Sequence, residues 1–342
     1  MPNESALPPR RINGAPTLED VAAQAGVSRA LVSIVMRDVP GAAVATRKRV
    51  LAVADELGYR PDNRARLLAG RRTRLLGVTL ALNNPFHADI AEGIYAAAEP
   101  LGYQVVLSAV TSTREPGRAI DSLLSYRCEA AILVGALVPA RALTVLVQRL
   151  PVVVVGQPAP NPAVDVVRAA DDQGMRLAVD HLVALGHRSI VHVDGGRAPG
   201  ARARRNGYKA AMRRHGLANA IQVLAGGEAE EDGAAAARRL ADAGVPDAVL
   251  TYNDRSAVGL LDVFARCGIA VPEDISVVGY DDSQVARLPY LRLTTVSQDA
   301  GQLANLAVKR AVSRLEHEQI ADREVILTPH LVVRGTTRAA AS

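Results

Sequence analysis

The sequence predicts an α/β protein with a small helical head followed by a larger body of two lobes built on parallel sheets. Three observations lead to this prediction. A chain of 342 residues exceeds the size of one typical domain. Its first 60 residues hold short helix signals separated by glycines, whereas from residue 75 onward short apolar runs alternate with amphipathic stretches. Such alternation is typical of parallel sheets with helices on both faces.

The composition excludes several classes of protein. At 49% hydrophobic and 22% charged residues, the chain is neither wholly disordered nor fibrous. No apolar run approaches the roughly 18 residues of a membrane-spanning helix, and residues 1–14 lack the apolar stretch of a secretory signal. Two cysteines, Cys128 and Cys267, cannot form a disulfide framework or a four-ligand zinc site. We expect a cytoplasmic protein without membrane association, cofactor or metal, and a disordered leader over residues 1–15.

The charge is concentrated at one end of the chain. Residues 1–75 hold 13 Arg and Lys against 7 Asp and Glu, a surplus of +6, whereas the remainder holds 27 against 28. A basic head on a nearly neutral body favours a polyanionic partner such as nucleic acid. A solvated basic tail would give the same surplus.

Two short helices joined by a tight turn are predicted at the start of the head. Thr17 can cap the first helix, with Asp20 in the capping-box position, and Gly26 can end it. Ser28 can cap a second helix that runs to about Met36. This spacing is that of a helix-turn-helix unit, although other small helical bundles use the same caps.

A third helix is predicted to begin near Thr46 and to end before Gly58. The head would then span residues 16–60. The residues expected to face its core are Val21, Ala22, Ala25, Leu31, Val32, Val35, Val50, Leu51, Ala54 and Leu57.

Residues 61–74 are predicted to be a linker. Pro61 pushes the residue before it out of the helical region, and residues 62–69 then offer only about two helical turns. Because an isolated helix shorter than about 12 residues is marginal in water, something must hold this one. The arginines of the segment favour a phosphate-rich partner; they are Arg64, Arg66, Arg71, Arg72 and Arg74.

The body, residues 75–342, is predicted to alternate strands and helices. Strands are expected at 75–82, 104–108, 130–134, 152–155, 189–193, 221–224, 248–251 and 275–279. Helices are expected at 88–99, 174–185, 202–215, 232–243 and 256–266. Ligands of such folds bind beyond the carboxyl ends of the strands, so the residues after each strand are the candidates for a site.

Several motifs occur in a fixed order along the chain. They are Thr-Leu-Glu-Asp-Val-Ala at 17–22 with Ala-Gly-Val-Ser at 25–28, Glu-Leu-Gly-Tyr-Arg-Pro at 56–61, Asn-Pro-Phe at 84–86, Leu-Gly-His-Arg at 185–188, Asn-Asp at 253–254, the segment 272–282, and Thr-Thr at 294–295 followed by Gln298. Together they resemble the LacI/GalR family of bacterial transcription regulators, and the resemblance covers residues 17 to about 335.

The resemblance implies an N-terminal helix-turn-helix head, a hinge helix and a two-lobed body like a periplasmic sugar-binding protein. The lobes would comprise about 75–168 plus 299–325, and 169–298 plus 326–335. It also implies a dimer on a pseudo-palindromic operator. The family favours a repressor over an activator, but the sequence itself does not show the sign of regulation. The tail after Arg334 carries no leucine heptad, which favours a dimer over a tetramer. The sequence leaves open whether the ligand releases DNA or promotes its binding.

The resemblance assigns DNA-contacting positions. Arg29 can pair with guanine, Ala30 can contact a thymine methyl, and Ile34 stands where many members carry a basic residue. In the hinge, Leu68 matches a leucine that is wedged between base pairs in the minor groove. The complete set is Ser28, Arg29, Ala30, Ser33 and Ile34 in the major groove, Thr17, Arg47 and Arg49 on phosphates, and Arg64, Ala65, Leu68 and Ala69 in the minor groove.

The resemblance also implies an effector site between the lobes. His87 stands where many members have a second aromatic residue, and Arg204 lies in an arginine run that would otherwise be a solvated face. The expected effector-binding residues are Asn84, Phe86, His87, Arg204, Asn253, Asp281 and Gln298. Amides, a guanidinium and a carboxylate suit a polyhydroxylated ligand, a sugar first and a nucleoside next. Asp281-Asp282 could also be a helix cap or a metal pair, and His187 is expected to be structural.

Two alternatives use the same body. An enzyme is disfavoured because the chain lacks a nucleophile elbow, a P-loop, a His-Glu-x-x-His pair and a dinucleotide fingerprint. A transport-associated sugar-binding protein or sensor without a DNA role would need export, but the chain carries a DNA-binding head in place of a signal peptide. A sequence-specific, ligand-controlled DNA-binding regulator is therefore the predicted function.

Overall fold

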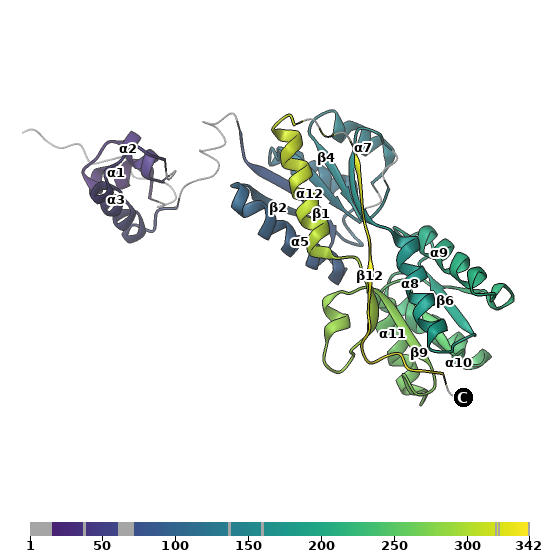
Figure 1. Cartoon of the computed structure of the whole chain (residues 1–342). Helices are drawn as coiled ribbons and strands as arrows, with labels where there is room; N and C mark the ends of the chain where they lie inside the picture. The colour runs from purple at the N-terminus through teal and green to yellow at the C-terminus, as the bar shows by residue number, and fades with distance from the viewer. Residues whose placement is uncertain are drawn as a thin grey trace, which may run out of the picture. The chain divides into compact units, whose positions relative to one another are not determined.

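A computed structural model describes residues 16–36, 39–60, 72–135, 138–158, 161–318, 320 and 322–340 (Figure 1). The chain forms two compact units, Met1–Thr73 and Arg74–Ser342, which are described separately. The predicted leader at 1–15 and the predicted hinge helix at 62–69, with its minor-groove residues Arg64, Ala65, Leu68 and Ala69, lie outside the described residues.

The first unit contains three helices, α1 (Leu18–Ala25), α2 (Arg29–Met36) and α3 (Val44–Glu56). The capping box at the start of α1 is present: the Thr17 backbone N–H donates to Asp20 Oδ2 at 2.7 Å, and the Asp20 N–H donates to Thr17 Oγ1 at 3.4 Å. Gly26 ends α1 with φ of +64°, a left-handed conformation that favours glycine. Ser28 then caps α2, because its Oγ accepts the Leu31 N–H at 3.2 Å. The predicted helix-turn-helix is confirmed.

The third helix differs from its prediction. It begins at Val44, and Ala43, which makes no side-chain capping hydrogen bond, occupies the N-cap position. Thr46 therefore lies inside the first turn and does not serve as the cap. Leu51, predicted to be inward, is 46% exposed. Val50 and Ala54 are buried and Leu57 is partly buried, and their i, i+4, i+7 spacing places them on one face of the helix. Leu51 lies about 100° around the helix axis from Val50 and therefore outside this face. Leu31 of α2 is likewise only half-buried.

The first lobe of the body is built on a six-stranded parallel sheet with strand order β11-β5-β4-β3-β1-β2. Its strands are β1 (Leu75–Ala81), β2 (Gln104–Val110), β3 (Ala130–Val134), β4 (Val152–Val155), β5 (Asp165–Ala169) and β11 (Glu324–Leu327). Its helices are α5 (Pro85–Ala98), η1 (Glu99–Leu101), α6 (Pro116–Ser125), α7 (Ala140–Val147) and α12 (Ala300–Leu315). α12 packs beside α5 on one face of this sheet (Figure 1).

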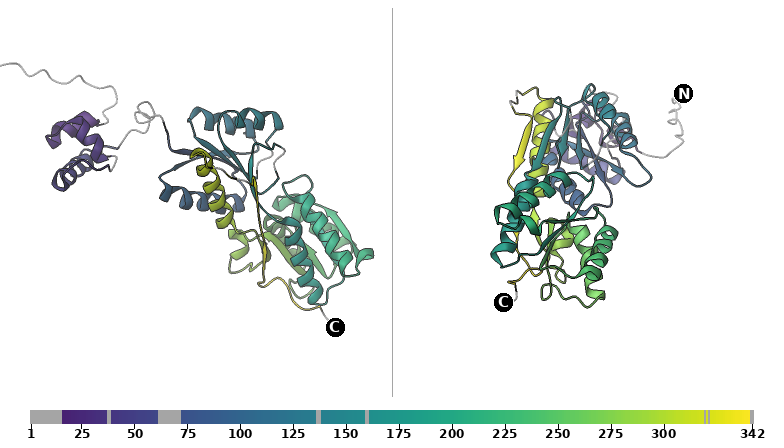
Figure 2. Two further views of the ribbon diagram at one scale, coloured as in Figure 1. Left: turned by 45° about the horizontal axis from the view of Figure 1, so that its top comes forward. Right: turned by 90° about the vertical axis from the view of Figure 1, so that its right-hand side faces the viewer.

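The second lobe has a six-stranded sheet of order β12-β10-β9-β8-β6-β7, in which only β12 runs antiparallel to its neighbour. Its strands are β6 (Ile190–Asp194), β7 (Gln222–Ala225), β8 (Ala248–Leu250), β9 (Ser276–Asp281), β10 (Thr294–Ser297) and β12 (His330–Val332). Its helices are α8 (Asp171–Ala184), α9 (Ala201–Arg214), η2 (Ala218–Ala220), α10 (Glu230–Ala243), α11 (Asp254–Arg266) and η3 (Gln284–Arg287) (Figure 2).

Because the strands of each sheet come from separate parts of the sequence, the chain passes between the lobes three times: after β5, after β10 and between β11 and β12. The predicted lobe boundary after residue 325 falls inside β11, so it has to be moved to the 327–330 connection. β11 is an edge strand with alternating exposure, which gives a short and weak apolar pattern.

All eight predicted strands and all five predicted helices of the body are present, with ends shifted by up to three residues. β5, β10, β11 and β12 lie outside the predicted strands, and α6, α7 and α12 are helices beyond the five predicted ranges. β10 illustrates the reason: its sequence Thr-Thr-Val-Ser reads as polar, yet all four residues are buried because neighbouring groups satisfy its hydroxyls. No helix in the described part of the chain is long and apolar enough to span a membrane.

Candidate ligand cleft and nucleic-acid interface

A cavity of about 40 Å³ lies between the two lobes at the carboxyl ends of their strands. All seven residues predicted to bind an effector line it. The first lobe contributes Asn84, Phe86, His87, Ile90, Val134, Gly135, Val155 and Gly156; the second contributes Pro199, Arg204, Glu228, Tyr252, Asn253, Asp281 and Gln298. The space holds only a few water molecules, since about 10–15 Å³ suffices for one.

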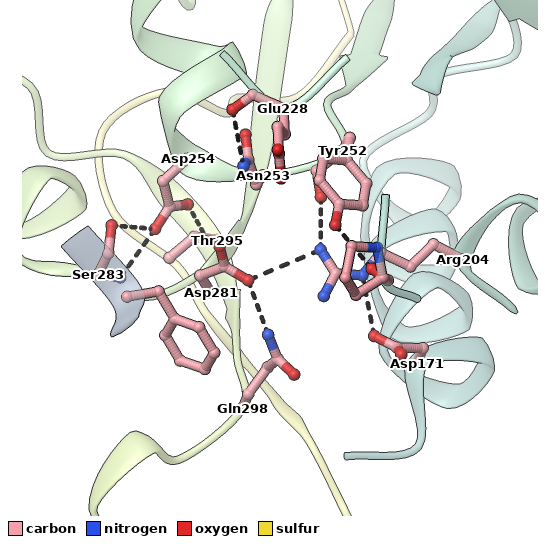
Figure 3. A network of polar contacts seen from close by, with 12 residues as sticks. Asp171, Arg204, Glu228, Tyr252, Asn253, Asp254, Asp281, Ser283, Thr295 and Gln298 are labelled. Carbon is pink, nitrogen blue, oxygen red and sulfur yellow. Dashed lines mark hydrogen bonds and ion pairs between the residues drawn. The ribbon is translucent and has the colours of Figure 1, made fainter. Parts of the chain in front are cut away.

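Arg204 is the centre of the polar network on the second-lobe wall (Figure 3). It is 4% exposed, so it is not part of a solvated arginine face. Its Nε donates to Asp171 Oδ1 at 2.9 Å, and its Nη1 donates to the Tyr252 carbonyl at 2.7 Å and lies 3.6 Å from Asp281 Oδ1. The guanidinium stacks between two aromatic rings, 3.7 Å from the Tyr280 centroid and 4.7 Å from that of Tyr252. A buried cation is thus held by two carboxylates and two ring faces.

Asp281 ends β9 in a strained backbone conformation. Its φ is +115° and that of Asp282 is +52°, a region that residues with a Cβ rarely adopt. The strain turns the Asp281 carboxylate into the cleft, where Oδ1 accepts a hydrogen bond from Gln298 Nε2 at 2.7 Å. Burial raises the pKa of Asp281 well above its ordinary value, against the opposing charge of Arg204. Asp282 pairs instead with Arg334 at 2.6 Å, and no metal-ligand cluster occurs among the described residues.

Asp254, which sequence reasoning did not assign to the site, ties the second-lobe wall together. Its Oδ1 accepts from Thr295 Oγ1 at 2.6 Å, and its Oδ2 accepts from both the N–H and the Oγ of Ser283 at 2.8 Å. Burial, supported by the charge of Asp282, raises the pKa of Asp254 to about 6. The Asn-Asp pair at the start of α11 and the Thr-Thr pair of β10 are both motifs of the sequence, but neither alone indicates this contact between residues 41 positions apart.

The two asparagines of the site are helix N-caps. Asn84 Oδ1 accepts the Phe86 N–H at 3.0 Å at the start of α5. Asn253 Oδ1 accepts the Ser256 N–H at 2.8 Å at the start of α11, and its Nδ2 donates to the Glu228 carbonyl at 3.0 Å. Asn253 therefore has both polar atoms engaged within the protein, whereas the Nδ2 of Asn84 keeps its donor capacity.

Phe86 and His87 form the first-lobe wall together with apolar strand ends. Phe86 is 5% and His87 is 8% exposed. The Ala81 N–H donates to His87 Nδ1 at 3.1 Å, and burial lowers the pKa of His87 to about 4. A neutral, hydrogen-bonded imidazole therefore stands where a second aromatic side chain was considered.

One ion pair joins the lobes outside the cavity. Arg287 Nη2 of η3 lies 3.2 Å from Asp89 Oδ2 of α5, and the same nitrogen donates to the Asp282 carbonyl at 2.7 Å.

His187 was predicted to be structural. Its Nε2 lies 2.9 Å from the Arg338 carbonyl and 3.0 Å from Ser276 Oγ. It thereby holds the C-terminal segment on the second lobe.

In the head, the start of α2 is presented to solvent. Ser28, Arg29 and Ala30 are exposed, and Arg29 Nη1 lies 3.2 Å from Glu19 Oε1 in a solvent-exposed pair. Ser33 and Ile34 are half-buried, and Arg49 is exposed.

Two of the predicted phosphate contacts have intramolecular roles. Thr17 serves in the capping box of α1. Arg47 donates to the carbonyls of Val35 at 3.4 Å and Val39 at 2.7 Å, which fixes the connection between α2 and α3.

A helix-turn-helix head and a two-lobed body with a polar cleft define a class of protein, the ligand-responsive DNA-binding regulators. Residues 17–62 match the family described as bacterial regulatory proteins, lacI family, and residues 179–337 match the periplasmic binding protein-like domain. The lactose operon repressor of Escherichia coli (strain K12) is 34% identical over 337 residues, 94% of this chain and 91% of the relative.

Solved structures agree. A LacI transcriptional regulator from a Rhodococcus species shares 47% identity with a TM-score of 0.74, covering 78% of this chain and 98% of that one. The lac repressor dimer bound to operator and the anti-inducer ONPF shares 30% identity with a TM-score of 0.79, covering 95% and 99%. The chain belongs to the LacI family of bacterial regulatory proteins.

Proposed function

We propose that the protein is a dimeric repressor that acts in the cytoplasm on a pseudo-palindromic operator, and that a small polar effector, a sugar, bound in the cleft sets its affinity for DNA. The observation that carries the proposal is the convergence of seven residues from two lobes on one cavity, in a chain whose head exposes the start of α2. The lactose operon repressor and the operator-bound lac repressor dimer support repression and dimerisation by analogy, and a solved complex of the transcriptional regulator CelR with cellobiose supports a sugar effector.

The chemistry of the cleft suits a polyhydroxylated ligand. Gln298 and Asp281 offer acceptors, whereas Arg204 and Asn84 offer donors, and a hydroxyl both donates and accepts. Arg204 is already balanced by Asp171 and Asp281, so the described lining residues offer no spare cation for a phosphate or carboxylate.

Ligand entry requires the lobes to separate. A cavity of about 40 Å³ is too small for a sugar ring, and the three connections between the lobes are the natural hinges. Opening and closing would shift the first lobes of a dimer relative to each other and so pair or part the hinge segments at 61–74. A coupling free energy on the order of 1–3 kcal/mol is sufficient for such control.

In the head, we assign base reading to Arg29, Ala30 and Ile34, with Ser28, Ser33 and Arg49 near phosphates. Arg47 and Thr17 would act mainly by fixing the helices, since their polar groups already have backbone partners. Leu68 would wedge into the minor groove beside Arg64, Ala65 and Ala69.

A gel shift with the DNA upstream of the protein's own gene tests the proposal. The wild type should shift this DNA, Arg29→Ala and Leu68→Gly should weaken binding at least tenfold, and Arg202→Ala on the body serves as the matched control. Addition of lactose, ribose, cellobiose or a nucleoside should change the affinity of the wild type, and Asp281→Ala should abolish that response while DNA binding remains. Failure of the wild type to bind any upstream DNA would refute the regulator, and an unaltered response of Asp281→Ala would refute the cleft assignment.

A further inference from the structure

His87 occupies the first turn of α5, directly opposite the charged wall of the cleft. The backbone N–H of Ala81, the last residue of β1, points at its Nδ1 at 3.1 Å. A ring nitrogen that accepts an N–H hydrogen bond carries no proton of its own. The hydrogen bond also fixes the orientation of the ring, because a ring turned by 180° would put a C–H against the Ala81 N–H.

The ring carries one proton at neutral pH. Burial lowers its pKa to about 4; the backbone hydrogen bond with Ala81 opposes this shift, and the positive charge of Arg255 supports it. The positive end of the α5 dipole also disfavours an imidazolium in the first turn of the helix. The charged side chains that line the same cavity, Arg204, Glu228 and Asp281, belong to the second lobe. With Nδ1 occupied as an acceptor, the single proton resides on Nε2.

The Nε2 edge of the ring faces the floor of the cleft at Gly135. A Cβ at that position would lie 2.3 Å from His87 Nε2 and 2.5 Å from Cε1, so only glycine leaves the ring in place. Gly135 also has φ of +58°, the left-handed conformation that glycine tolerates. Among the described residues, the backbone of Ala81 is the hydrogen-bonding partner of the ring.

We propose that His87 is a specificity-determining residue that acts only as a hydrogen-bond donor through Nε2, so that the effector presents an acceptor oxygen, a hydroxyl or a carbonyl, to the first lobe. The inference rests on the proposed function in placing the effector in this cleft. It specifies the direction of the hydrogen bonds to the ligand: the ligand accepts one from His87 on the first-lobe wall and donates one to Asp281 or Gln298 on the second-lobe wall. A ligand with a protonated amine or a deoxygenated carbon facing His87 is selected against, because the buried N–H would lose its partner.

The state of the ring is tested without any ligand. The full-length protein labelled with ¹⁵N in histidine is examined by long-range ¹H–¹⁵N NMR, and the His87 resonances are assigned by their loss in His87→Gln. We expect the Nε2-protonated neutral tautomer at pH 7 and protonation only near the pKa of about 4. A proton on Nδ1, or protonation near the ordinary histidine pKa, overturns the proposal.

The effect on specificity is tested by calorimetry with lactose, ribose and cellobiose on three proteins. His87→Gln keeps an amide donor, whereas His87→Phe has a similar volume and no donor. For any sugar that binds the wild type, His87→Phe should lose about tenfold in affinity and His87→Gln no more than about threefold, from the net worth of one hydrogen bond. Cooperative thermal unfolding of both variants serves as the folding control.

Equal affinity of the wild type and His87→Phe overturns the donor role. If no sugar binds the wild type, the sugar effector of the proposed function is wrong, and the tautomer measurement then decides the proposal on His87.

Discussion

The two walls of the cleft are built in different ways. Among the described lining residues, the first-lobe wall carries no charged side chain, and its polar groups are the Asn84 amide and the His87 imidazole. The second-lobe wall carries Arg204, Glu228 and Asp281, and the side chains of Arg204 and Asp281 already contact other protein groups. The second lobe therefore holds a charged network around Arg204 that forms without a ligand, whereas the first lobe supplies neutral groups with hydrogen-bonding capacity to spare.

This difference separates stability from specificity. Removal of a member of the buried network leaves an uncompensated charge, so the cost falls on folding. Removal of a first-lobe group leaves no buried charge, so the cost falls on ligand choice, as proposed for His87. Three substitutions away from His87 test this separation, and the expected effects decrease from the first to the third.

Arg204→Met should have the largest effect. It leaves Asp171 and Asp281 buried without their cation, and we expect the free energy of unfolding to fall by about 3–5 kcal/mol. Urea denaturation followed by circular dichroism measures it. Arg202→Met, two residues away on the exposed side of α9, is the control and should change stability by less than about 0.5 kcal/mol. Equal costs for the two variants would show that the network is not a folding element.

Asp254→Asn should change how stability depends on pH. The folded pKa of Asp254, about 6, lies above the ordinary value of 3.8, so the folded state binds the extra proton between these values. The contribution of Asp254 to stability is therefore complete below about pH 4 and is lost as the pH rises through about 6, by about 3 kcal/mol at most.

The measurement is the difference in unfolding free energy between the wild type and Asp254→Asn at several pH values. The difference removes groups common to both proteins, such as Asp180 and Glu230, whose lowered pKa values act in the opposite direction. A difference that stays constant across this range contradicts the assignment.

Asp89→Asn should have the smallest effect on stability. Arg287 is half-exposed, so the ion pair between the lobes is worth less than about 1 kcal/mol. A double-mutant cycle with Arg287→Gln should give a coupling energy of about 0.5 kcal/mol that shrinks in high salt. A coupling energy between Asp89 and Arg287 as large as the loss of unfolding free energy in Arg204→Met would mean that the contact between the lobes contributes to folding as much as the buried network does.

Local sequence features were sufficient for the head. The capping box of Thr17 and Asp20, the left-handed Gly26 and the Ser28 cap act within four residues of chain, so their outcome does not depend on distant contacts. The exception, Leu51, required a choice between two adjacent apolar residues of one helix, which only packing against the other helices makes.

In the body, ordered motifs located the seven lining residues but not the way in which they are used. Asn253 was expected to contact ligand, yet its amide caps α11 and binds the Glu228 carbonyl. Arg204 could equally have been one arginine of a solvated run, and its burial depends on Asp171, Tyr252 and Tyr280 from three other segments. These partners are 33 to 76 residues away in the chain, beyond the reach of any local pattern.

The sequence alone thus determined the class of protein, the caps of the head, the alternation of strands and helices and the identity of the cleft residues, because periodicity, capping and motif order are local properties. The tertiary structure decided where β10, β11 and β12 lie in the sheets, with β11 and β12 at edges and β10 between β12 and β9, and which polar atoms of the cleft have partners. Both depend on contacts between segments that are distant in sequence, such as those of Asp171 with Arg204 and of Thr295 with Asp254.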